Sequence, residues 1–360
     1  MKKSLLALAV LGAYAGVASA QSSVTLYGTV DLNGRYVKQD VTSGEDHRWS
    51  LGRDGINSSQ LGFRGIEDLG GGLKAGFLLL SSVGADSGDI GAGQSAAGSG
   101  KFWTRRSTVS LFSNAGELRL GRDYTPTFWN NTIFDAFGTN GLGDSTGGVI
   151  QLVSQTFVRA DNSIGYHLPA NIGGFYGQFM AAASENGQAG QASNGGRYLG
   201  GRVGFAAGPF DVAFAYAQQR TVQGANTDQD TWNLGGAYDF GFLKLMGYYD
   251  HDKRDNVGKE DRWSISAVIP LGQGEVHLGY DRSKLNLDLP NVPDNKIWKV
   301  AATYQYNLSK RTAMYGTVAL LDNGDLSNNS ISPQGTGTPI GTRELGGKSK
   351  GFEVGIRHFF

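Results

Sequence analysis

The chain has 360 residues, no cysteine and a formal net charge of +0 at pH 7. Without cysteine it cannot be a disulfide scaffold, and without a net basic charge it lacks the surface that nucleic-acid binding requires. Glycine is frequent at 56 residues and tyrosine and phenylalanine contribute 15 and 18, whereas proline contributes only 8. This composition excludes collagen and favours a wide β-barrel, in which strands bend and aromatic girdles mark the membrane interfaces.

The N-terminus has the pattern of a secretory signal peptide. Two lysines precede an apolar stretch, residues 5–17, and Ala18-Ser19-Ala20 forms an A-x-A cleavage site. The stretch is short for a membrane-spanning helix, and no later run approaches the roughly 18 apolar residues that such a helix needs. We expect residues 1–20 to be removed and residues 21–360 to form the mature protein. The alternative is a buried N-terminal helix.

From there to the end of the chain, segments of alternating apolar and polar residues recur. In the first, VTLYGTVDLNGRY, Val24, Leu26 and Val30 share one face, whereas Thr29 and Asp31 lie on the other. Segments of about ten residues with this period are the signature of membrane-spanning strands, whose apolar face meets lipid and whose polar face lines water.

The connections between these segments alternate in length. Seven are tight, near residues 68–72, 114–116, 169–174, 208–209, 241, 272–274 and 309–310. Eight are mostly longer, near residues 40–57, 84–100, 124–155, 184–196, 221–230, 254–259, 287–295 and 324–348. Fifteen connections predict an all-β fold, a transmembrane antiparallel β-barrel of about 16 strands in one domain. A closed barrel of that size satisfies every backbone polar group in lipid and encloses an aqueous channel.

The last strand ends on an apolar face. One face of it carries Phe352, Val354, Ile356, His358 and Phe360, and the sequence stops on that phenylalanine. This terminal pattern resembles the last strand of outer-membrane barrels, and the resemblance implies that Phe360 is an assembly signal for the barrel assembly machinery.

Five stretches spread over the whole mature chain carry a family resemblance: SSVTLYGTVD, LGFRGIEDLGGGLKAGF, RRSTVSLFSNAGELRLGRDYTP, NLSKRTAMYG and VGIRHFF. They resemble the general trimeric porins of Gram-negative β-proteobacteria, in particular the anion-selective members. The resemblance implies a homotrimer in the outer membrane, in contact with lipid and lipopolysaccharide, that passes small anions and hydrophilic solutes. No cofactor is expected, and the five histidines show no metal-ligand spacing.

Alternation along the strands indicates which charged residues face the channel. It places Gln60 and Arg64, then Arg106, then Arg159 on the lumen side, with Arg105 next to Arg106. Arginine on the lipid face near the bilayer midplane would cost about 2–4 kcal/mol, which supports this assignment. The resemblance implies constriction arginines at the positions of Gln60, Arg106 and Arg159. Because Gln60 departs from that pattern, we expect only a moderate anion preference.

The connection over residues 124–155 contains TPTFWNNTIFDAFGTNGLGD. An outer loop with so many aromatic residues would be unusual in water. The resemblance implies that this third loop folds into the barrel and narrows it, with Asp135 and Asp144 available to oppose the wall arginines. The alternative is an apolar patch used for subunit contact.

Three other functions compete with a general diffusion channel. A secreted all-β lectin or adhesin would be soluble without detergent. An outer-membrane hydrolase would need a nucleophile with a base, and no GxSxG or comparable catalytic arrangement is found. A substrate-specific channel on the same fold would differ only in details of the loops and lumen.

Overall fold

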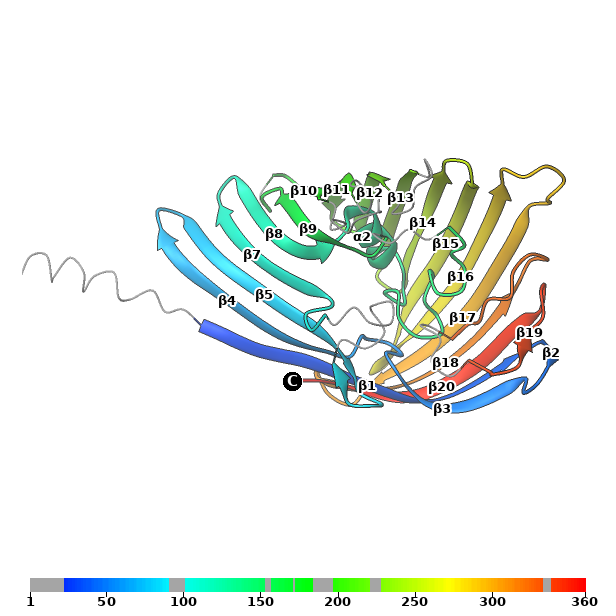
Figure 1. The fold of residues 1–360 in the computed structure, drawn as a ribbon. Coiled ribbons are helices and arrows are strands. Elements are labelled where there is room, and N and C mark those ends of the chain that lie inside the picture. Colours follow the sequence, from blue (N-terminus) through cyan, green and yellow to red (C-terminus); the bar gives the residue numbers. More distant parts are fainter. Residues whose placement is uncertain are drawn as a thin grey trace, which may run out of the picture.

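A computed structural model describes residues 23–90, 101–152, 157–170, 172–183, 197–220, 228–332 and 338–360. The predicted signal peptide therefore lies outside the described residues. The described chain forms a closed antiparallel β-barrel of 16 strands, which confirms the predicted fold class. Figure 1 shows the strands as a curved wall around a central space that holds the helix α2.

The elements follow one another along the chain, with β2, β6 and β19 as short strands in the outer connections. Their bounds are β1 (Ser23–Gln39), β2 (Val41–Ser43), β3 (His47–Arg53), β4 (Gln60–Gly70), β5 (Leu73–Gly84), β6 (Asp89–Ile90), β7 (Arg106–Ser113), β8 (Gly116–Tyr124), α2 (Pro126–Ile133), β9 (Arg159–His167), β10 (Phe175–Ala182), β11 (Tyr198–Ala207), β12 (Phe210–Gln219), β13 (Gln229–Asp239), β14 (Lys244–Arg254), β15 (Gly258–Leu271), β16 (Gly274–Leu287), β17 (Asn295–Asn307), β18 (Thr312–Asp322), β19 (Thr342–Arg343) and β20 (Lys348–Phe359).

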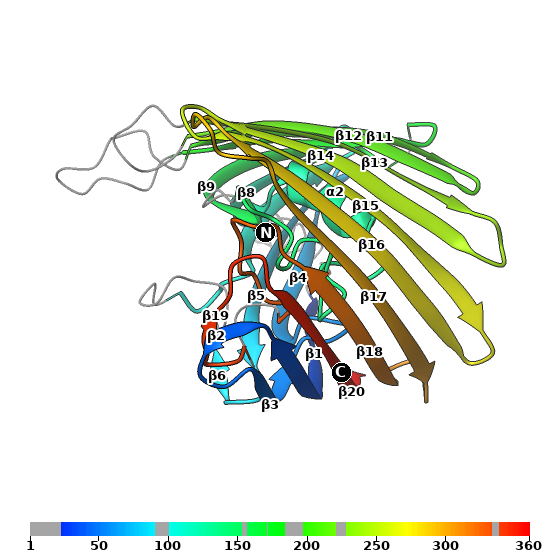
Figure 2. The ribbon, with the colours of Figure 1, turned by 90° about the vertical axis from the view of Figure 1, so that its right-hand side faces the viewer.

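The ring is built from sequential antiparallel pairs and closes between β1 and β20. The other edge of β1 pairs with β4 in its first half and with β3 in its second half. β3 and β4 are therefore two halves of one barrel strand, interrupted at residues 54–59. In Figure 2 the strands run obliquely across the wall, as closure of a barrel requires.

The strand alternation has the polarity expected of a barrel in lipid. Apolar side chains on the outer face are exposed, for example Val24 at 65% and Ile164 at 57%, whereas Asp31 and Arg262 on the inner face are buried. A soluble protein shows the reverse. Among the described residues, no helix has the length and apolar character needed to cross a membrane.

Each of the seven predicted tight turns separates two consecutive barrel strands. The predicted outer loop over residues 40–57 is wrong in part, because it contains β2 and β3. Trp49 and Leu51 alternate with smaller residues in HRWSLGR and point outward, 65% and 59% exposed. Because charged residues stand at both ends of that segment, the short alternation between them was not recognised as a strand. The whole of the predicted loop 184–196 and parts of the predicted loops 84–100, 221–230 and 324–348 lie outside the described residues.

The last residue takes part in barrel closure. Phe360 and Gly28 exchange backbone hydrogen bonds, each N–H donating to the other residue's carbonyl oxygen at 3.1 Å. The phenyl ring is 45% exposed on the outer face. The end of the chain therefore continues the seam between β1 and β20.

Deleting Phe360 is expected to lower the fraction of the chain that folds into a heat-modifiable barrel several-fold. The truncation removes two backbone hydrogen bonds, each worth about 1 kcal/mol, together with the terminal apolar side chain. Densitometry of unheated and heated samples on gels measures the effect. Phe360→Leu keeps the backbone bonds and an apolar end and serves as the control. A normal folded yield from the truncated chain would contradict the assembly role.

Candidate functional site: the constriction inside the barrel

The segment after β8 turns into the barrel rather than out into solvent. Thr125 caps α2 by accepting a hydrogen bond from the Phe128 amide at 3.4 Å, and Pro126 occupies the first helical turn, where its missing N–H costs nothing. After Ile133 the chain runs on along the inner wall. We call residues 125–152 the constriction loop; residues 153–155 of the predicted 124–155 segment lie outside the described residues.

Aromatic side chains of the constriction loop fill hollows in the wall. Phe134 is fully buried over Gly235, where an added Cβ would lie 2.1 Å from its ring. Phe137 packs over Gly279 in the same way, because a Cβ added there would lie 2.6 Å from its ring. It also joins Leu142 in a buried cluster with residues of the barrel wall. These side chains therefore pack inside the barrel and are not an outer patch for subunit contact.

Charged groups of the wall bind the backbone of the constriction loop. Lys299 donates to the carbonyl oxygens of Asp144 and Gly147, the latter at 2.8 Å. Glu260 accepts hydrogen bonds from the amides of residues 151 and 152, and Glu353 accepts one from the amide of residue 142 at 3.2 Å. Strand alternation places such residues on the lumen side, but it cannot show that they hold a loop.

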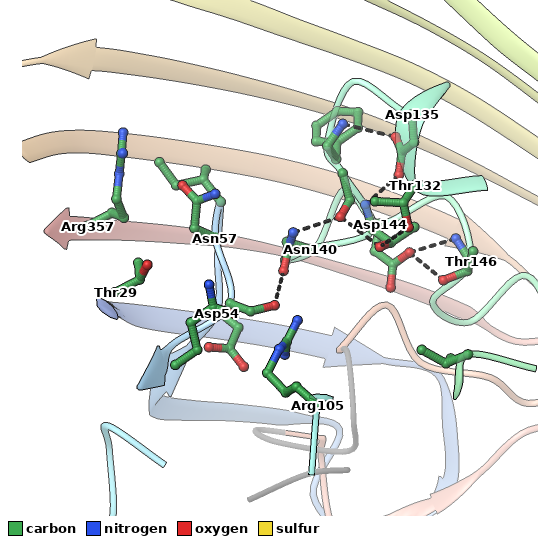
Figure 3. A pocket seen from close by; sticks show the side chains of 18 of the residues that line it. Thr29, Asp54, Asn57, Arg105, Thr132, Asp135, Asn140, Asp144, Thr146 and Arg357 are labelled. Carbon is green, nitrogen blue, oxygen red and sulfur yellow. Dashed lines mark hydrogen bonds between the residues drawn. The ribbon is translucent and has the colours of Figure 1, made fainter. Parts of the chain in front are cut away.

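Opposite the loop stands a wall of arginines. Arg159 at the start of β9 lies over the Tyr124 ring, 4.3 Å from its centroid, and donates to its hydroxyl at 2.8 Å. Arg106 at the start of β7 pairs with Asp123 at 3.0 Å. Arg105, the residue before it, lines the same cavity and donates from Nη1 to the Ser82 hydroxyl at 3.4 Å. In Figure 3, Arg105 points toward the loop segment that carries Asn140 and Asp144.

These groups surround a cavity of about 880 Å³ in the lumen. Among the described residues, six arginines and four carboxylates line it: Arg35, Arg53, Arg105, Arg106, Arg159 and Arg357, with Asp54, Asp135, Asp144 and Glu275. Low-dielectric walls focus the field of such charges on the solution between them. By count the lining has two more arginines than carboxylates, and three of its arginines pair with carboxylates behind it: Arg35 with Glu353, Arg53 with Asp86 and Arg106 with Asp123.

The two loop carboxylates are used largely by the loop itself. Asp135 accepts hydrogen bonds from the amides of Phe137, Thr139 and Ser145 at 3.0, 2.9 and 3.2 Å. Burial raises the pKa of the Asp135 carboxyl, and these amides partly oppose that rise. Asp144 Oδ1 accepts from the amide and hydroxyl of Thr146 at 2.7 and 2.6 Å. Both line the cavity, but their charge is tied into the fold of the loop.

Sequence reasoning missed an inward turn at residues 54–59, between β3 and β4. The Asp31 carboxylate holds it by accepting from the amides of Ile56 and Asn57 at 2.9 and 2.8 Å. Ser58 donates to Asn140 of the constriction loop at 2.7 Å, so the turn contacts the loop inside the barrel and lines the same cavity. The Asp54-Gly55 pair, with φ of 62° at Asp54, is a turn signal that could have revealed it.

A second inward segment was also missed. Residues 328–332 belong to the predicted outer connection 324–348, yet Ile331 is buried beside the constriction loop. Asn329 donates from its side-chain amide to the Gly148 carbonyl at 2.8 Å. The predicted connection 324–348 does join β18 to β20, but this part of it turns inward, because an apolar residue anchors it in the barrel mouth.

The remaining predicted residues lie on β4. Gln60 lines the cavity and faces Thr29 across the β1–β4 pair. Arg64 shares that face but lies nearer the end that holds the tight turns, opposite Thr25 and 5.4 Å from the Tyr27 ring centroid. It is exposed and does not line the cavity. The structure thus brings together Gln60, Arg105, Arg106 and Arg159, and leaves Arg64 outside the group.

Comparisons with known proteins agree with this architecture. A family model described as Gram-negative porin matches residues 7–326. Outer membrane porin protein 32 of Delftia acidovorans is 43% identical, with all of both chains covered. An outer membrane porin protein of Bordetella pertussis is 30% identical over 88% of this chain and 93% of its own. The solved anion-selective porin from Comamonas acidovorans is 40% identical, covers 94% of this chain and 100% of its own, and superposes with a TM-score of 0.81.

These relatives are channel proteins and not enzymes, consistent with a sequence that shows no catalytic motif. The family model matches most of the chain, and the Delftia relative aligns over its full length. The chain therefore belongs to the Gram-negative porins, the channel-forming β-barrels of the outer membrane.

Proposed function

We propose that this porin is a general diffusion channel for small hydrophilic solutes and ions, with a moderate preference for anions. The observation that carries the proposal is the asymmetry of the constriction. Arg105, Arg106 and Arg159 converge on one wall of the cavity, whereas Asp135 and Asp144 across from it bind amides of their own loop. The electrostatic potential in the solution between the arginine wall and the loop is therefore positive.

Two features keep the preference moderate. Gln60 stands on the arginine wall without a charge. Arg106 and Arg119 share the Asp123 carboxylate at 3.0 and 2.6 Å, and Arg53 pairs with Asp86 at 2.7 Å. Each pair cancels part of the wall's charge. General diffusion is favoured over a specific binding channel because the cavity of about 880 Å³ is lined by a mixture of charged, small polar and aromatic groups rather than by one chemical class.

The proposed partners follow from the family resemblance and from the outer face. A homotrimer is proposed, inserted by the barrel assembly machinery into a membrane that contains lipopolysaccharide. The exposed apolar residues of the outer face supply the surface for lipid and for neighbouring subunits.

Planar-bilayer recording of the purified protein tests the function. In a gradient of potassium chloride the zero-current potential should have the sign of an anion-preferring pore, with a permeability ratio of a few to one. Insertions should appear as steps that close in thirds if the porin is a trimer. A zero-current potential with the sign of a cation-preferring pore would refute the proposal. So would a failure of small neutral sugars to permeate in liposome swelling assays.

A further inference from the structure

We propose that Arg282, Lys284 and Lys296, on the outside of the barrel, form a binding site for a phosphate group of a lipid in the outer leaflet. We call these three residues the outer cationic patch. The inference rests on the proposed lipid environment of the outer face, but not on the proposed anion preference. It concerns a surface that takes no part in conduction.

Strand register defines the position of the patch. On β16, Asp281 and Ser283 point inward and are buried, so Arg282 and Lys284 between them point outward and are exposed. Lys296 on β17 lies directly opposite Lys284, and Trp298 lies directly opposite Arg282. The three cations thus share one face of two neighbouring strands.

An aromatic row runs through the patch near the loop ends of the strands. Tyr249, Trp263, Arg282 and Trp298 stand opposite one another in register across β14, β15, β16 and β17. The Tyr249 and Trp263 rings are 4.4 Å apart, and Trp263 is 54% exposed. Tryptophan and tyrosine gather at membrane–water interfaces, where lipid headgroups lie. The row lies toward the end of the strands opposite both termini and the tight turns, which is the outer-leaflet side.

The patch carries more positive charge than its neighbours neutralise. Like charges directly opposite on one face of a sheet destabilise it, as at Lys284 and Lys296. Asp294 pairs with Lys284 at 2.8 Å. Asp261, opposite Lys284, already accepts from the Tyr249 hydroxyl at 2.5 Å and pairs with His251 at 2.7 Å. An anion placed among the three cations would relieve this repulsion.

The surface below the patch identifies the anion as part of a lipid. One step closer to the membrane centre, Ile265, Tyr280 and Val300 form an exposed apolar row, again in register. An acyl chain can lie on this row while its phosphate reaches the cations one row above. A free phosphate would gain nothing from the apolar row, whereas a phosphorylated lipid gains from both rows.

Native mass spectrometry in detergent tests the site, with the bisphosphorylated lipid A of lipopolysaccharide as the probe. The variant K284Q/K296Q should bind this lipid about tenfold more weakly than the natural chain. R197Q/R220Q serves as the charge-matched control, because it also removes two exposed cations at the outer ends of strands. The control should bind as the natural chain does. Dephosphorylated lipid A should bind the natural chain as weakly as it binds the variant.

Four results would overturn the proposal. Equal lipid binding by K284Q/K296Q and the natural chain would show that the lysines do not form the site. Equal binding of dephosphorylated lipid would show that phosphate is not recognised. Tight binding of inorganic phosphate alone, or loss of trimers in K284Q/K296Q with lipid binding intact, would identify a free-anion site or a subunit contact instead. Bilayer conductance of the variant, which should be unchanged, separates these outcomes from a failure of the channel function.

Discussion

Replacing Arg106 and Arg159 with glutamine is expected to shift the zero-current potential toward cations and to lower the anion-to-cation permeability ratio several-fold. Both side chains line the cavity on the wall that faces the constriction loop. The substitution leaves Asp54, Asp135, Asp144 and Glu275 in place, so the excess of positive charge around the cavity disappears. Glutamine keeps hydrogen-bonding capacity and much of the length, so folding should be nearly unaffected.

Two further variants make this result specific to position. Gln60→Arg adds a cation to the same wall and should move the potential the opposite way. Arg64→Gln removes a lumen-facing cation that does not line the cavity, so its effect should be much smaller. The shifts should shrink as salt rises, because the Debye length falls from about 30 Å at 0.01 M to about 3 Å at 1 M. If the zero-current potential at low salt is unchanged in both R106Q/R159Q and Q60R, these residues do not determine the selectivity.

Filling the hollow under Phe134 is expected to displace the constriction loop and enlarge the channel. Gly235→Val places atoms where the Phe134 ring lies, since even a Cβ would stand 2.1 Å from it. Loss of that packing costs about 3 kcal/mol, on the scale of deleting a buried phenylalanine. Single-channel conductance should rise and become noisier, and a protease should cut the loop faster.

The same strand offers a matched control. Gly236→Val adds the same side chain one residue along, where an added Cβ meets no atom closer than 3.4 Å. Its conductance should stay at the natural value. In G235V/F134A the hollow is filled but the ring is gone, so part of the natural conductance should return. If G235V conducts quietly at the natural level, the phenylalanine does not hold the loop in place.

The barrel itself could be predicted because the alternation of apolar and polar residues that marks each strand is visible within the strand's own sequence. A strand repeats every two residues, so Val24 and Leu26 reveal their face without knowledge of any partner. The loop's move into the lumen was predicted from its aromatic residues together with the family resemblance, since Phe134 and Phe137 have no place in water. Parity also assigned Arg106 and Arg159 to the lumen.

The parts that were missed depend on contacts between distant residues. The inward turn at residues 54–59 exists because Asp31 binds the amides of Ile56 and Asn57. Nothing in the local pattern of either segment shows that contact. The same is true of Asp135, whose partners are amides of its own loop. From the sequence, a carboxylate that opposes an arginine looks the same as one that folds a loop.

The attachment of the constriction loop to the wall has a mechanical consequence. Glu260 on β15, Lys299 on β17 and Glu353 on β20 each bind the loop backbone, and Phe134 anchors it against β13. The loop therefore connects separate strands across the lumen, because any flattening of the barrel changes the distances between its attachment points. The width of the constriction is thus coupled to the shape of the barrel cross-section. Lateral pressure from the surrounding bilayer is transmitted to the pore through these attachments.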